Sequence, residues 1–341
     1  MPVGSGTTLG WGALLGFGEE TVLGTRVTAT SFMEFRSESF AKTIEEEKLE
    51  SLGTGRASAR RVQKGVDVKG SLTYDFHPMD GIKILKQALM GTVTSGQIAT
   101  TGAFNHTMTV GDLSGITQKG LSFEIKKSSD TTTAFMFYGC RVNTFKLSAA
   151  IGQPIKTDVS FIGYDGTTGA FATTTATYSP IRPFLFMDGT FLIDGTPASL
   201  TSTSSENIIS FELQINNNLQ ADASARSLGT ALLTALPPGR REVSLKITQR
   251  FDTTTAWDRF RLGTAASIRL RFITDVTISN AATTYSCLID LNKVYYNSAV
   301  PMVSGPGILT HDVDISSISD TVTSAGTDMT VSLTNTTTSY A

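Results

Sequence analysis

The sequence predicts a mainly β protein made of two tandem β-sandwich or barrel modules, each with one short flanking α-helix and a long protruding hairpin. Three observations lead to this prediction. Short segments of alternating apolar and polar residues lie between Gly- and Thr-rich turns, as expected of half-buried strands. Only two segments have helical apolar spacing. At 38–76 and again at 205–251, a strand pattern is followed by a long polar segment and then by a second strand pattern. We call each of these polar segments an excursion and the strand that follows it the return strand.

Length and composition fit this fold class. The chain has 341 residues, enough for two domains of ordinary size. Charged residues are 17% of the chain, below the roughly 25% of a typical soluble domain, and Thr, Ser and Gly take their place. The formal net charge of -2 provides no basic field for binding nucleic acid. No long apolar run or cationic leader is present, so we expect no membrane insertion.

The first half of the chain is predicted to hold an extended arm at 1–26 and a first module at 27–165. In the module, the return strand of the hairpin alternates strictly from Val66 to Phe76. A short amphipathic helix is predicted within 78–91, with Asp80 as its N-cap. A Thr/Gly-rich insertion follows, and then three strands. The predicted insertion and strands occupy 92–118, 120–127, 134–149 and 156–164.

The second half repeats this order after a linker at 166–183. Its predicted module, 184–318, has a return strand that matches the first at an offset of 175 residues, a helix ending at Gly263, and strands that include 311–315. Cys287 matches Cys140 at an offset of 147, and the difference is close to the length of the insertion. These offsets predict an internal duplication. The Ser/Thr-rich residues 319–341 are expected to be a mobile tail or an arm ordered by a partner.

No catalytic or metal-binding constellation is evident, so we expect neither an enzyme nor a cofactor. The three histidines share no ligand spacing, and strand alternation explains His311 beside Asp312 and Asp314 as well as a metal site does. Cys140 and Cys287 lie in the middle of strands beside aromatic residues, as buried small hydrophobic residues do. Ser39 and Lys42 form an S-x-x-K pattern, but the other motifs of such enzymes are missing.

The polar excursions are the candidate contact sites. The first is charged, and either a solvated loop or a contact with a neighbouring subunit explains it. The second has a similar length without the same charges, and this recurrence favours contact. The candidate contact residues are Glu45, Glu46, Glu47, Arg56, Arg60, Arg61, Asn216, Asn217, Asn218, Arg226, Arg240 and Arg241.

Six stretches together resemble a known family. They are GEETVLGT (18–25), SESFAKTIEEEKL (37–49), GVDVKGSLTYDF (65–76), PFLFMDGTFLIDG (183–195), FELQINNNL (211–219) and PPGRREVSLKITQRFD (237–252). Their order resembles that of a phage tail tube protein of the long, non-contractile siphophage type. The chain departs from the pattern where Leu245 stands at the position that Gly70 has in the first half, and in having two modules where many relatives have one.

The resemblance implies a structural virion protein that closes into rings, and the rings stack into a hollow tail tube. The tube surrounds a tape-measure protein, meets terminator and tip proteins at its ends, and later conducts double-stranded DNA. One-module relatives form hexameric rings, so a two-module chain is expected to form a trimer with pseudo-sixfold symmetry. Assembly is expected in the host cytoplasm. Polar residues of the return strands are candidates for facing the lumen, namely Asp67, Lys69, Thr73, Asp75, Ser244, Lys246 and Thr248.

Two other function classes remain open at this stage. A tail-tip or adhesin-type β-sandwich binding protein would be favoured by exposed aromatic clusters in loops, but these loops hold Thr, Gly and Ser. A hydrolase on a β-sandwich would be favoured by paired carboxylates in a cleft, and the sequence locates none.

Overall fold

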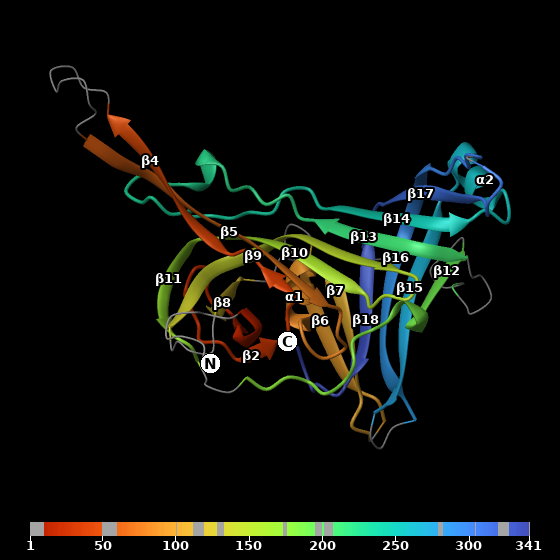
Figure 1. The fold of residues 1–341 in the computed structure, drawn as a ribbon, viewed down its shortest axis with the longest axis horizontal. Coiled ribbons are helices and arrows are strands. Elements are labelled where there is room, and N and C mark those ends of the chain that lie inside the picture. The colour runs from red at the N-terminus through yellow and green to blue at the C-terminus, as the bar shows by residue number, and fades with distance from the viewer. Residues whose placement is uncertain are drawn as a thin grey trace, which may run out of the picture.

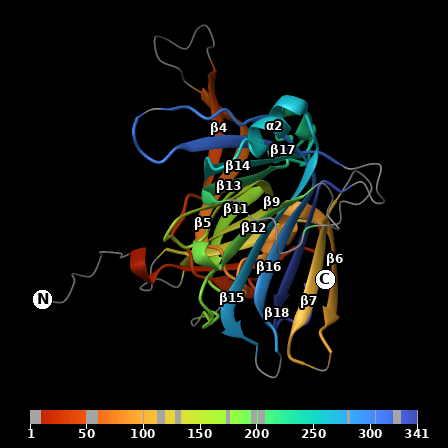
Figure 2. The same cartoon turned by 90° about the vertical axis from the view of Figure 1, so that its right-hand side faces the viewer.

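The computed structural model describes residues 10–49, 60–99, 101–111, 119–127, 133–172, 176–194, 200, 207–278, 282–303, 305–319 and 327–340. Strands dominate these residues, and two short helices lie beside them (Figures 1 and 2). The predicted mainly β fold is therefore confirmed. Among the described residues, no helix has the length and apolar character needed to cross a membrane.

The first half holds one helix, α1 (Ile82–Leu89), and strands up to β11. These strands are β1 (Leu14–Glu19), β2 (Ser31–Met33), β3 (Ser37–Glu38), β4 (Ala41–Leu49), β5 (Arg60–Asp75), β6 (Met90–Gln97), β7 (Phe104–Val110), β8 (Leu121–Lys126), β9 (Thr133–Ala150), β10 (Lys156–Gly163) and β11 (Asp165–Ala170).

The second half holds one helix, α2 (Thr255–Leu262), and the remaining strands. They are β12 (Gly189–Asp194), β13 (Ile208–Asn216), β14 (Glu242–Arg250), β15 (Ala266–Thr277), β16 (Thr284–Ser298), β17 (Thr310–Ser317) and β18 (Met329–Asn335).

The two halves meet on strand β9. One edge of β9 pairs first with β8 and then, over 144–150, with β13. Its other edge pairs with β11 and then with β10. A long sheet therefore runs from β4 through β5, β10, β9, β13, β14 and β17 to β16. Strands β2, β1 and β8 extend from the first part of β9 as a second sheet.

The order of strand pairing in the first half recurs in the second. The antiparallel order β1–β8–β9–β10–β5–β4 of the first half corresponds to β12–β15–β16–β17–β14–β13. In both halves a further strand joins the start of the longest strand, β11 on β9 and β18 on β16. The recurrence extends beyond the hairpins from which the duplication was predicted.

β-Bulges recur at corresponding places. The β8–β9 and β15–β16 ladders each shift register directly after their first pair. In β9–β10 the shift lies beside the pair Ser160–Thr144, and in β16–β17 it lies beside the pair Asp314–Ser298. Because a bulge requires one extra residue at a defined position, these coincidences align β9 with β16 residue by residue.

A hydrogen bond supports the predicted match of the return strands. The Thr73 hydroxyl donates to Asp158 over 2.6 Å, and the Thr248 hydroxyl donates to Asp312 over 2.7 Å. Thr73 and Thr248 differ by the predicted offset of 175 residues. Both bonds join a return strand to the next strand of the sheet.

The predicted match of the two cysteines is wrong. Cys140 pairs with Leu121 in the first pair of its ladder, where the second half has Val294 opposite Ala266. Cys287 lies seven residues earlier, opposite Phe272. An aromatic-X-Cys pattern on a long alternating strand recurs by composition, so it does not fix the register.

Both predicted helices are present, with one change at their ends. Helix α1 begins after Gly81, whose φ of 74° suits glycine, and not with an Asp80 cap. The Asp80 carboxylate instead accepts a hydrogen bond from the Ser179 amide. Helix α2 ends at Gly263 with a φ of 60°, as predicted.

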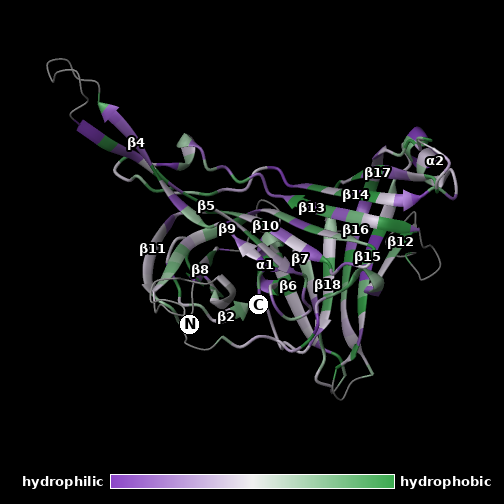
Figure 3. Ribbon diagram, in the orientation of Figure 1, coloured by the Kyte–Doolittle hydropathy of each residue, from purple (hydrophilic) through white to green (hydrophobic). Residues whose placement is uncertain are grey.

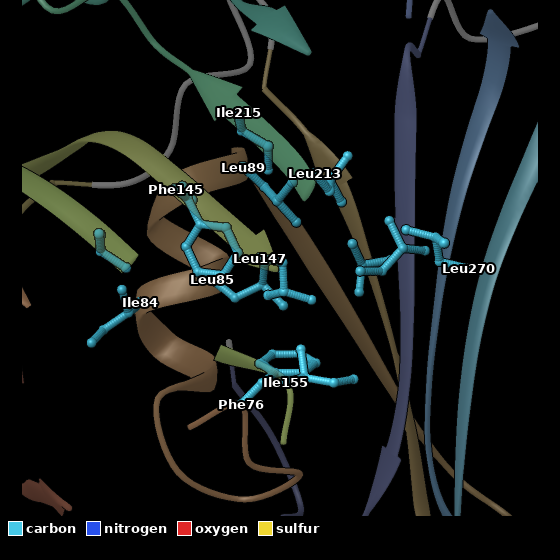
Figure 4. Close-up of a cluster of buried hydrophobic side chains, with 14 of the residues drawn as sticks. Phe76, Ile84, Leu85, Leu89, Phe145, Leu147, Ile155, Leu213, Ile215 and Leu270 are labelled. Atoms are coloured by element: carbon cyan, nitrogen blue, oxygen red, sulfur yellow. The ribbon is translucent and has the colours of Figure 1, made fainter. Parts of the chain in front are cut away.

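One apolar core spans both halves. Helix α1 packs its apolar side chains against strands β9 and β13, so residues from the two halves bury one another (Figure 4). The residues shown in this part of the core include Ile84, Leu85, Leu89, Phe145, Leu147, Leu213 and Ile215.

Gly70 is required by an aromatic ring. A Cβ atom at this position would lie 2.4 Å from the Phe40 ring. Phe40 is 5% exposed and stacks on Phe137 and Phe161 at 5.4 Å. The small residue on β5 therefore makes room for an aromatic cluster, while Leu245 fills the matching position of the second half with its own side chain.

Four segments predicted to be arm, insertion, linker or tail contain paired strands. Strand β1 belongs to the predicted arm, and β11 belongs to the predicted linker. Strands β6 and β7 lie largely within the predicted insertion and pair with each other. The insertion agrees with the element order, since the second half has no strand between α2 and β15. The arm and linker predictions are wrong because strand pairing stabilises Gly- and Thr-rich segments whose alternation is weak.

The C-terminal prediction is wrong for the same reason. Strand β18 lies between β16 and β7, so its backbone is bonded on both edges. Val331, Leu333 and Asn335 are fully buried, and the Asn335 amide donates to the Pro78 carbonyl and to the Tyr340 hydroxyl. These residues belong to the body of the protein, so a mobile tail is excluded for 327–340.

We predict that Leu333→Ala lowers the free energy of unfolding by about 2–5 kcal/mol, because it removes a buried side chain from a packed core. Leu228→Ala is the matched control, since Leu228 is fully exposed, and it should change stability by less than about 0.5 kcal/mol. Denaturant unfolding of the two variants measures the difference. Equal stability of the two variants would show that β18 is not part of the cooperative core.

Candidate functional site

A polar face extends across the long sheet and through both halves. Alternation places the core residues of β5, such as Leu72, on one side and Asp67, Lys69, Thr73 and Asp75 on the other. On β14, Ser244, Lys246 and Thr248 likewise point away from the buried side chains. All the predicted lumen candidates thus share one face.

Strand register joins the lumen candidates of β5 to those of β14. One row of paired residues crosses six strands, and acidic and basic side chains alternate along most of it. A hollow of about 630 Å³ lies over the middle of this row. In strand order the row contains Asp75, Lys156, Ser148, Glu212, Lys246 and Asp314.

Ion pairs compensate charges on the polar face. Lys146 of β9 and Glu212 of β13 lie 2.7 Å apart and join the two halves. Lys156 pairs with Asp158 at 3.0 Å. Such half-exposed pairs add little stability, but they leave the face without a strong field of either sign.

The first hairpin, β4–β5, protrudes from one end of the molecule (Figure 1). Its outer part is hydrophilic (Figure 3), and residues 41–48 are exposed. Glu46 pairs with Arg61 at 2.8 Å, and Glu47 pairs with Lys64 at 3.0 Å.

The other candidate contact residues of this hairpin lie on its strands or outside the described residues. Glu45 and Arg60 lie on its two exposed strands, and Arg56 lies outside the described residues. Among the described strands only β5 pairs with β3 and β4, and at the base of the hairpin Lys42 contacts Asp165 of β11 at 2.6 Å.

The second excursion does not protrude, which corrects the prediction of two free hairpins. Residues 217–241 fold back over the first half of the chain. Asn217 is buried and donates hydrogen bonds to the carbonyls of Ala88 and Val142. Arg226 pairs with Asp67 at 2.6 Å.

The rest of the second excursion is also held within the chain. Asn216 and Asn218 hydrogen-bond each other, and Asn218 donates to the Arg240 carbonyl. Arg241 pairs with Asp328 through two nitrogens, at 2.8 and 2.9 Å, and donates to the Gly111 carbonyl.

A small apolar cluster explains why this excursion folds back. Leu219, Ala225, Leu233 and Leu236 are buried together against Met90, at the end of α1. Burial of such leucines favours the docked position by about 1.5–3 kcal/mol each. The sequence analysis missed these residues, although the ALLTAL run at 231–236 was a usable apolar signal.

The residues that the sequence offered for chemistry have other roles in the described part of the chain. They contain no group of three His, Cys, Asp or Glu placed to hold a metal. Burial raises the pKa values of Cys140 and Cys287 and keeps both thiols protonated. The two members of the S-x-x-K pattern are engaged separately, Ser39 with Ser71 and Lys42 with Asp165.

Sequence comparison identifies the family. The family described as phage tail tube protein matches residues 10–338, which is nearly the whole chain. The chain belongs to the phage tail tube protein family. The predicted resemblance is therefore confirmed, and the chain is a structural tail tube subunit of the virion.

Other comparisons add less. A solved structure of the SPP1 tail tube is similar to this tail tube protein over 46% of its chain and 82% of the SPP1 chain, with 12% identity and a TM-score of 0.31. That score is too low to support an argument about the fold. None of the curated proteins matches the chain.

We predict that Arg241→Met destabilises the tail tube protein by about 3–5 kcal/mol, because it leaves the Asp328 carboxylate buried without its partner. Arg61→Met is the matched control: its ion pair with Glu46 is exposed, so the loss should stay within about 1 kcal/mol. Thermal and denaturant unfolding of the two variants give the comparison. Similar losses would mean that Arg241 does not hold the second excursion to the body.

Proposed function

We propose that three copies of this chain close into a ring with pseudo-sixfold symmetry, and that stacked rings form the tube that conducts double-stranded DNA. Each chain contributes two modules, one built from β1 to β11 and one from β12 to β18, which descend from one duplicated unit. The recurring pairing order and the matched bulges support this duplication. The family itself implies self-assembly into stacked rings.

The polar sheet face is proposed to line the bore. Its carboxylates lie beside lysines and an arginine, and several of the charges neutralise one another. A conduit must not hold DNA, because each phosphate that a lysine neutralises strengthens binding. A wall of mixed charges with Ser and Thr between them gives a wet surface without a strong attraction. This continuous face across both modules is the observation on which the proposal depends.

The remaining assignments follow from the tube. Glu45, Glu46, Glu47, Arg60 and Arg61 of the protruding hairpin are proposed to contact a neighbouring subunit. A tape-measure protein inside the tube, and terminator and tip proteins at its ends, are the proposed partners. Assembly takes place in the host cytoplasm, and the protein acts without catalysis or a cofactor.

Electron microscopy of the purified protein tests the proposal. We expect rings or tubes in negative stain. End views should look sixfold, while the mass of one ring should correspond to three chains. A monodisperse monomer under all assembly conditions would overturn the proposal, and binding of that monomer to glycans would favour a tail-tip or adhesin role.

A thiol-labelling experiment tests which face lines the bore. Lys246 is exposed on the polar face, so Lys246→Cys should react in free subunits with both a small maleimide and a polymer-linked maleimide too large for the bore. In tubes, only the small reagent should react at the same rate. The free subunit serves as the control. Rapid reaction of the polymer reagent with intact tubes would place this face outside.

A further inference from the structure

Two strands form the junction between the two halves of the chain. Strand β13 supplies an edge and is called the donor here, and β9 receives that edge and is called the acceptor. The donor is the edge of β13, which pairs with β9 from Ser210 opposite Ala150 to Asn216 opposite Thr144. This junction buries backbone groups that would otherwise form an exposed sheet edge.

The segment after β13 completes the junction. The Asn217 amide donates to the Asn143 carbonyl over 2.8 Å, and the Leu219 amide donates to the Asn143 side chain over 3.0 Å. The Asn217 side chain also caps the end of α1 through the Ala88 carbonyl. The excursion therefore covers both the edge of β9 and the C-terminal end of α1.

Among the described residues, no strand pairs with the matching edge of β16 beyond Val294. The bulges place Ser298 where the first half has Thr144, which makes Asn297 the counterpart of Asn143. Helix α1 is buried along nearly its whole length, whereas Ala256 is the only buried residue that α2 has. The end of the long strand and the helix of the module are thus covered in the first half and open in the second.

We define the open end as Leu262 of α2, residues 297–303 and Ile308; Ala299 within it is buried, but several of its apolar side chains are exposed. Leu262 is 63% exposed, Met302 75%, Val303 81% and Ile308 77%. Hydrogen bonding of the Phe251 amide to the Leu309 carbonyl holds the 305–309 segment beside the strand that leads into α2. Such exposed apolar groups mark a contact surface.

A matching donor is present at the opposite end of the molecule (Figure 1). Thr43 pairs with Asp67 on β5 as Asn216 pairs with Glu242 on β14, so β4 is the counterpart of β13. Within the described residues, β3 and β4 pair only with β5, and their other edge has no strand beside it. Ile44, just beyond Thr43, is 47% exposed.

We propose that the edge of β4 in one copy pairs with the open end of β16 in a second copy, in the manner in which β13 pairs with β9 within the chain. This inference rests on the proposed ring and names its contact. Thr43 of one copy lies beside Ser298 of the next, and the β4–β5 hairpin covers Leu262, Met302 and Val303. Donor and acceptor are different surfaces, so the contact is head-to-tail, which is the kind of contact that the proposed ring requires.

Cysteine cross-linking tests this register. In assembled rings of the double variant Thr43→Cys with Ser298→Cys, a short bis-maleimide should link neighbouring chains. The products should be covalent dimers and trimers and nothing larger. Thr144→Cys with Asn216→Cys is the matched positive control, because the same positions face each other within one chain. The single variants are the negative controls, and the native cysteines are fully buried.

Distinct outcomes separate the contact from the function. Absence of rings from the unmodified protein overturns the proposed function. If rings form normally and only the intrachain control cross-links, this contact is overturned and the proposed tube function is retained. Cross-linked products of up to six chains would overturn the trimer and retain the contact.

A second pair of variants tests the open end directly. Met302→Asp with Val303→Asp should reduce ring yield at least tenfold while the monomer keeps its melting temperature, because both side chains are exposed in the free chain. Met187→Asp is the control, since Met187 is 82% exposed and lies outside the open end. Normal ring yield from the double variant would overturn the proposal.

Discussion

Every strand edge needs a hydrogen-bonding partner, and this constraint determines how the chain is arranged. Strand β9 satisfies it along most of its length, with β8 and β13 on one edge and β11 and β10 on the other. The pairing with β13 makes one sheet out of two halves. An unpaired edge of this length would promote uncontrolled association, so the same constraint directs attention to β4 and β16, where the pairing within the chain ends.

The long sheet separates two environments. On one side, helix α1 and aromatic residues such as Phe40 and Phe161 form the common core. On the other side, paired charges such as Lys146 and Glu212 alternate with hydroxyl groups. Under the proposed function both surfaces have a use, since the core would give a stiff wall and the polar face a wet surface that does not retain a polyanion.

Some parts of the site were predictable from sequence and others were not. The polar face was predictable, because alternation from Val66 to Phe76 fixes which side of β5 is buried. The charges of Glu46 and Arg61 correctly marked an exposed hairpin. The destination of residues 217–241 was not predictable from their polarity, since it depends on Leu233 and Leu236 meeting Met90, which is distant in the sequence.

The sequence by itself determined the mainly β class, the two helices, the matching return strands and the family, because periodicity, caps and motif order are local properties. Tertiary structure alone decided that β18 lies between β16 and β7, that Cys287 does not correspond to Cys140, and that the second excursion docks on the first half. Sheet pairing joins residues far apart in the chain, and its register depends on bulges and shared burial that local patterns do not encode.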